Sequence, residues 1–60
     1  MTDEELRDAI KIMRQRARRV GTQHALWDVI FDCEALLVGG MTAVPREDIE
    51  RAVTAELARP

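Results

Sequence analysis

The chain has 60 residues, of which 47% are hydrophobic and 33% are charged, and its formal net charge is -2. This composition is typical of one small globular domain, and it argues against a disordered segment or a membrane-spanning helix, which needs ~20 apolar residues. One cysteine cannot form an intrachain disulfide, and no cluster of Cys and His residues predicts a zinc site.

Residues 3–20 are predicted to form the first helix. Thr2 suits the N-cap position, and Glu5 completes a capping box with it. Gly21 is predicted to end the helix in the left-handed conformation. Apolar residues at helical spacing form a packing seam along one side of the helix. The seam consists of Leu6, Ile10, Met13, Ala17 and Val20.

A second helix is predicted over about residues 23–38, with Thr22 as its N-cap and Gly39 and Gly40 at its end. The short break after the first helix predicts a tight antiparallel hairpin. The apolar arc of the second helix covers about two thirds of its circumference, well beyond the ~100° of an ordinary surface helix. Its centre is formed by Leu26, Ile30, Cys33 and Leu37.

A third, shorter helix is predicted over residues 45–58. Pro45 suits the first turn, because the N–H group that proline lacks is not needed there. Ile49, Val53 and Leu57 form a narrow apolar stripe. No strand alternation or repeat appears in the sequence. The predicted fold class is therefore all-α, with an antiparallel helical hairpin plus a third shorter helix.

The wide apolar arc of the second helix predicts a protein interface. Trp27, Phe31 and Val38 lie on one flank of that arc, and Ile12 lies off the main seam of the first helix. Trp and Phe are frequent anchors of protein interfaces. The competing interpretation places the aromatic side chains in the core, under the third helix and the loop before it.

Self-association is the expected source of additional stability. Residues 1–60 form a single small helical domain, and a domain of this size without disulfides or metals often gains stability by forming oligomers. We therefore expect a homodimer that assembles as a dimeric helical bundle. The partners are then a second copy of the chain and a larger protein.

Arginines in the second half of the first helix are candidates for contact with nucleic acid or with an acidic partner, because no acidic residue lies within reach on the same helix. The net charge of -2 and the lack of a distinct recognition helix argue against nucleic acid. Arg7 and Lys11 share one face of the helix with two of these arginines. The candidates are Arg14, Arg16, Arg18 and Arg19.

Two patterns of potentially reactive side chains give only weak indications of a metal site or of a catalytic residue. His24, Asp28 and Asp32 recur at helical spacing and carry metal-ligand groups, but no fourth ligand adjoins them, and a solvated strip is the preferred interpretation. Cys33 is expected to be a buried, unreactive thiol. We predict no catalytic residue, no metal and no cofactor, so the chain is not expected to be an enzyme.

The leading hypothesis is a small helical protein-interaction or regulatory module that associates with itself, docks on a larger protein, or does both. The two other hypotheses are a nucleic-acid-binding regulator that uses the arginines of the first helix, and an accessory subunit of a larger complex. The acidic start of the chain is unlike a secretory signal and predicts a cytoplasmic location. The abundance of Arg beside a single Lys suggests a bacterial or phage source.

Overall fold

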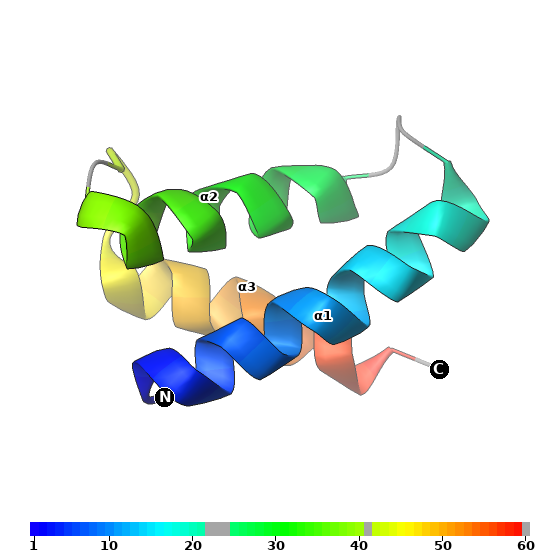
Figure 1. The fold of residues 1–60 in the computed structure, drawn as a ribbon, viewed down its shortest axis with the longest axis horizontal. Helices are drawn as coiled ribbons and strands as arrows, with labels where there is room; N and C mark the ends of the chain where they lie inside the picture. The colour runs from blue at the N-terminus through cyan, green and yellow to red at the C-terminus, as the bar shows by residue number, and fades with distance from the viewer. Residues whose placement is uncertain (22–24, 41, 60) are drawn as a thin grey trace.

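The computed structural model describes residues 1–21, 25–40 and 42–59 (Figure 1). These described residues form the helices α1 (Asp3–Val20), α2 (Leu26–Gly39) and α3 (Arg46–Ala58), and none of them lies in a strand. Each helix packs against the other two. The prediction of an all-α chain with three helices is therefore confirmed over these residues.

The start of α1 has the predicted capping box. The hydroxyl of Thr2 accepts a hydrogen bond of 3.1 Å from the N–H of Glu5. The Glu5 carboxylate in turn accepts one of 2.8 Å from the N–H of Thr2. The bond from the Thr2 N–H lowers the pKa of Glu5, because a donor favours the charged carboxylate, and the Thr2 side chain acts in the same direction.

The end of α1 differs from the prediction. Gly21 has φ 92° and ψ 172°, a combination that glycine adopts readily but that lies outside the left-handed helical region. Its N–H still donates a hydrogen bond of 3.0 Å to the carbonyl of Ala17.

The helix α2 begins at Leu26 rather than at residue 23, with Ala25 at the N-cap position and no side-chain cap. The predicted cap, Thr22, lies outside the described residues. The end of α2 is as predicted. Gly40 adopts the left-handed conformation, with φ 66° and ψ 18°, and its N–H bonds to the carbonyl of Leu36 at 3.0 Å.

The helix α3 begins at Arg46, one position after Pro45, which is the N-cap residue. The carbonyl of Pro45 accepts the first hydrogen bonds of the helix, from Asp48 at 3.0 Å and Ile49 at 3.1 Å. Both ends of α3 are tied to α1. At the start of α3, Arg46 forms an ion pair of 2.9 Å with Asp3 of α1. At its last turn, the carbonyl of Glu56 accepts a hydrogen bond from Arg16 of α1.

The core lies between the helices and follows most of the predicted seams. Three predicted packing residues differ. Val20 is 53% exposed, and Leu57 is only partly buried. Leu37 is also only partly buried, because it lies where α1 and α2 leave a groove between them. Leu36 also packs against the core. The buried apolar residues are Leu6, Ala9, Ile10, Met13, Ala17, Leu26, Ile30, Cys33, Ile49 and Val53.

Candidate interaction surfaces

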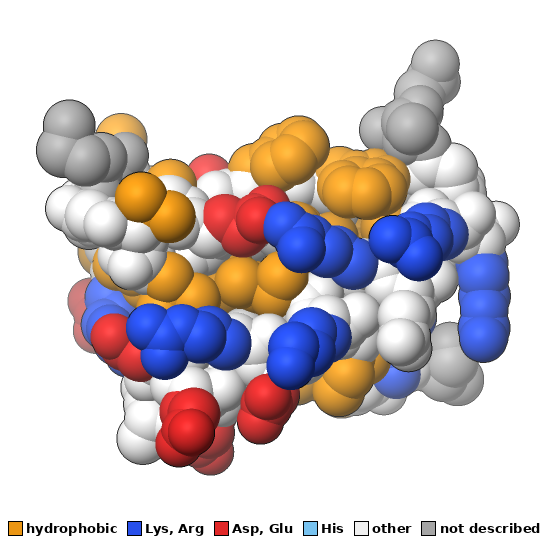
Figure 2. Space-filling view, in the orientation of Figure 1, with side chains coloured by type: hydrophobic (Ala, Val, Ile, Leu, Met, Phe, Trp, Pro, Cys, Tyr) orange, Lys and Arg blue, Asp and Glu red, His pale blue; other side chains and the backbone are white. Residues whose placement is uncertain are grey.

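The outer side of α2 carries an apolar stripe that the described residues cover only in part. It consists of Trp27, Phe31 and Val38, which we call the α2 stripe. Phe31 is 60% exposed and Val38 is 90% exposed. Residues at this spacing lie on one side of a helix. Figure 2 shows hydrophobic side chains exposed over α2, and large apolar side chains in such positions mark contact surfaces.

The two aromatic residues of the stripe are held together. Their ring centroids are 5.9 Å apart with an interplanar angle of 34°, within the range of favourable aromatic pairs. The indole N–H of Trp27 donates a hydrogen bond of 3.0 Å to the carbonyl of Gly21, at the end of α1. Trp27 also packs partly on the core, so the aromatic pair is positioned before any partner binds.

Ile12 lies on a different surface from the α2 stripe. It is 43% exposed, as a surface residue would be. This side of α1 is turned towards α3, because Arg16, which follows Ile12 by one turn, contacts the last turn of α3. Arg14, which projects from another side of α1, forms an ion pair with Glu34 of α2. The structure therefore brings together three of the predicted interface residues and separates Ile12 from them.

The predicted arginine cluster is divided between different contacts. Arg14 is paired with Glu34, and the guanidinium of Arg16 donates hydrogen bonds to carbonyls of α3. Arg18 and Arg19 are exposed, and neither has an ion pair within the described part of the chain. The sequence interpretation of this cluster rested on the lack of acidic partners on the same helix, whereas the partners of Arg14 and Arg16 lie on α2 and α3.

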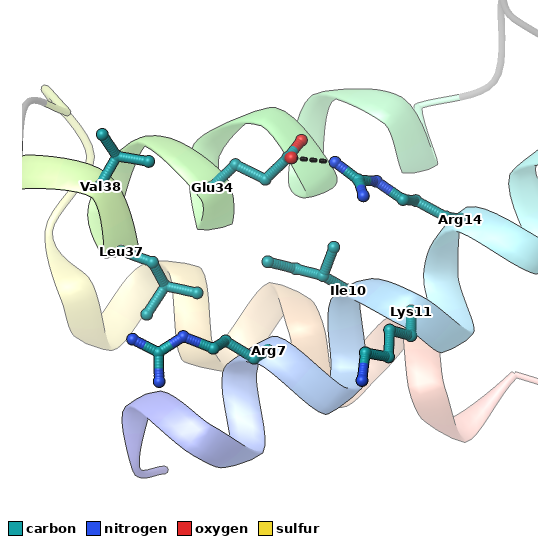
Figure 3. Close-up of a pocket in the computed structure, with 7 residues that line it drawn as sticks. All are labelled: Arg7, Ile10, Lys11, Arg14, Glu34, Leu37 and Val38. Atoms are coloured by element: carbon teal, nitrogen blue, oxygen red, sulfur yellow. Dashed lines mark hydrogen bonds and ion pairs between the residues drawn. The ribbon is translucent and has the colours of Figure 1, made fainter.

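A groove of about 300 Å³ lies between α1 and α2, as the close-up in Figure 3 shows. We call it the α1–α2 groove. Charged side chains stand at its rim, and apolar side chains from both helices line it. Sequence reasoning placed the cations on one face of the first helix but missed the groove, since it assigned Leu37 to the core. The lining residues are Arg7, Ile10, Lys11, Arg14, Glu34, Leu37 and Val38.

Cys33 is buried against α1, with its Sγ atom 4.0 Å from the carbonyl oxygen of Leu6. Burial raises the pKa of the thiol, and the nearby carboxylate of Glu34 acts in the same direction. A neutral buried thiol packs as a small apolar group and is a poor nucleophile.

Metal binding gains no support from the part of the chain that the structure describes. Those residues contain no group of three or more His, Cys, Asp or Glu side chains placed to hold a metal ion. The weak pattern of His24, Asp28 and Asp32 is not addressed by this finding, because His24 lies outside the described residues.

No helix among the described residues combines the length and the apolar character required to cross a membrane. Comparison of the chain with protein families, with curated proteins and with solved structures finds no significant match in any of the three.

Proposed function

We propose that the chain is a small helical protein-interaction module that associates with a second copy of itself through the α2 stripe. The observation that carries the proposal is the exposure of Phe31, at 60%, and of Val38, at 90%, in line with Trp27 on one side of α2. Burying these side chains against a partner removes apolar surface from water, at roughly 25 cal/mol for each Å².

The proposal includes an antiparallel hairpin of α1 and α2. Two contacts support this arrangement. Early in α1, Leu6 lies against Cys33 in the second half of α2, and after the end of α1, Gly21 is bonded to Trp27 near the start of α2. Residues later in α1 thus lie opposite residues earlier in α2, as they do in an antiparallel pair of helices. The outer side of α2, which carries the stripe, then faces away from the core.

Charges on the two sides of the α2 stripe favour a second copy as its partner. Asp28 and Asp32 each follow an aromatic residue of the stripe by one position, which places them ~100° further round the helix. On the other side, towards α1, lies Arg14, which is paired with Glu34 of α2, and Arg18 follows it by one turn on the same face of α1. Figure 2 shows Lys and Arg side chains beside hydrophobic ones over α2. The stripe therefore has an acidic flank and a basic flank.

These flanks also favour one orientation of the dimer. When two α2 helices pack in parallel about a two-fold axis along their length, the acidic flank of each copy meets the basic flank of the other. When they pack antiparallel about an axis across the helices, flanks of like charge meet. Opposite charges stabilise an interface and like charges disfavour it. The stripe is thus complementary to itself in the parallel arrangement, as a two-fold interface requires.

Sedimentation equilibrium over a range of micromolar concentrations tests the proposal. We expect the wild-type chain to show the mass of a dimer, and Phe31→Gln to shift it to a monomer of unchanged helix content in circular dichroism. Ile12→Gln is the matched control, because Ile12 is also exposed but lies on another surface. That control should remain dimeric. A wild-type chain that is a well-folded monomer throughout would contradict the proposal.

A further inference from the structure

We infer that the α1–α2 groove binds an amphipathic acidic segment of a partner protein, one in which apolar side chains are flanked by Asp and Glu. This inference goes beyond self-association, because it concerns a different partner and a groove that only adjoins the α2 stripe, with Arg14 and Val38 at the border of the two. It rests on the charges at the rim of the groove, on the apolar residues inside it, and on the way the two are arranged.

The rim of the groove carries more positive charge than the chain neutralises. Arg7 and Lys11 are exposed, and neither has an ion pair among the described residues. Arg14 is paired with Glu34 at one end of the groove. In Figure 3 Arg7 and Lys11 project from α1, while Arg14 reaches across to Glu34 of α2. Carboxylates spaced one helical turn apart would meet Arg7 and Lys11 in turn.

The interior of the groove is apolar and is built by both helices. Ile10 of α1 is 7% exposed and Leu37 of α2 is partly buried, while Val38, which also belongs to the α2 stripe, is 90% exposed at the edge of the groove. A partner with apolar side chains removes this surface from water when it docks. Amphipathic helices commonly bind proteins in this manner, with their apolar face in a groove and their charges at the edge.

Other classes of ligand fit the groove less well. A phosphate backbone would meet the carboxylate of Glu34 and would leave the apolar residues uncovered. A small molecule would find little room, because about 300 Å³ lies at the lower end of the ~300–1,000 Å³ that such sites span. A segment that carries both acidic and apolar side chains matches the basic rim of the groove and also its apolar lining.

The test uses a labelled synthetic helical peptide whose leucine face is flanked by glutamates, with fluorescence anisotropy as the measurement. Two control peptides are measured beside it, one with lysines in place of the glutamates and one with serines in place of the leucines. We expect the wild-type chain to bind the first peptide alone, and added salt to weaken that binding, because rim charges are screened.

Matched variants locate the binding surface. The double variant Arg7→Glu and Lys11→Glu should weaken binding by about tenfold or more. The control, Arg51→Glu with Arg59→Glu, makes the same change in net charge on α3 and at its C-cap, at side chains that are 75% and 62% exposed. It should bind like the wild type. If the first variant does not fold, Arg7→Gln with Lys11→Gln replaces it.

Several results would overturn the inference. Equal losses in both double variants would show a general charge effect, and equal binding of the glutamate and lysine peptides would exclude the basic rim as the determinant. Tighter binding of a DNA duplex, lost in the Arg7 and Lys11 variant, would favour nucleic acid instead. Sedimentation of the same samples separates the two proposals, because loss of peptide binding in an intact dimer concerns the groove alone.

Discussion

The guanidinium of Arg16 in α1 donates a hydrogen bond of 2.7 Å to the backbone carbonyl of Glu56 in the last turn of α3. A second bond, of 3.4 Å, reaches the carbonyl of Leu57. Carbonyls at the end of a helix lack partners within it, and the helix dipole favours a cation there. The last turn of α3 contains no basic residue of its own, so α1 supplies the cation.

Replacing Arg16 should therefore destabilise the fold although the residue lies outside the apolar core. We expect Arg16→Met to lower the free energy of unfolding by about 1–3 kcal/mol, because carbonyls of α3 lose a charged donor. Arg19→Met is the control, since Arg19 is exposed, and it should change stability by no more than ~0.5 kcal/mol. Urea unfolding followed by circular dichroism measures both. Equal losses of stability in the two variants would show that the contact between Arg16 and α3 does not stabilise the fold.

Replacement by alanine should lower the stability of the fold by different amounts at two aliphatic residues of α2, Ile30 and Leu37. Ile30 is 0% exposed, so Ile30→Ala should cost about 2–5 kcal/mol. Leu37 is partly buried beside the groove, so Leu37→Ala should cost clearly less. The comparison uses the shift in urea midpoint at one protein concentration. A larger loss for Leu37→Ala would place the centre of the core nearer the end of α2.

The Cys33 thiol should react slowly in the folded chain. It is buried, and burial raises its pKa, so little thiolate is present at mildly alkaline pH. A chromogenic disulfide reagent should label the unfolded chain in urea much faster than the native chain. Because the folded pKa is raised, this group's contribution to stability is present at neutral pH and is lost as the pH rises through that raised value. Equal labelling rates would contradict the buried position.

Acid should weaken the contact between α3 and the start of the chain. Hydrogen bonds from Arg46, at 3.0 Å, and from the terminal ammonium of Met1, at 3.3 Å, lower the pKa of Glu50. The folded chain then binds fewer protons in acid than the unfolded chain, so its stability falls as the pH drops through this lowered pKa. Glu50→Gln removes the titrating group.

Unfolding in urea at a series of pH values tests this expectation. The variant Glu50→Gln should be less stable than the wild type at neutral pH, and its stability should depend less on pH in the acid range. Glu47→Gln is a suitable control, because Glu47 is exposed at the same end of α3 and has no ion pair among the described residues. Identical acid profiles for the three proteins would rule out the role of Glu50.

A charge exchange tests the proposed orientation of the dimer. In the parallel arrangement, Arg18 of one copy lies near Asp28 of the other. Arg18→Asp should therefore shift sedimentation towards the monomer, as should Asp28→Arg, because each variant brings like charges together. The double variant should restore the dimer, since both charges are reversed. If each single change leaves the dimer intact, the helices do not pack in this orientation.

The sequence predicted best those features that depend on neighbouring residues. The capping box needs only Thr2 and Glu5, and the end of α2 needs only a glycine that tolerates positive φ at Gly40. Leu37 was misplaced because its burial depends on where α1 and α2 separate, and helical spacing carries no information about that separation. The partner of Arg16 lies on another helix, so a local charge pattern could not identify it.

The chain contains a single tryptophan, and that residue belongs to the α2 stripe. The indole N–H of Trp27 is bonded to the carbonyl of Gly21, and its ring lies beside the exposed ring of Phe31. Intrinsic fluorescence therefore comes from one position, next to the end of α1 and to the proposed contact with a second copy. Emission that moves to shorter wavelength with rising protein concentration would report the loss of water around this side chain without any label.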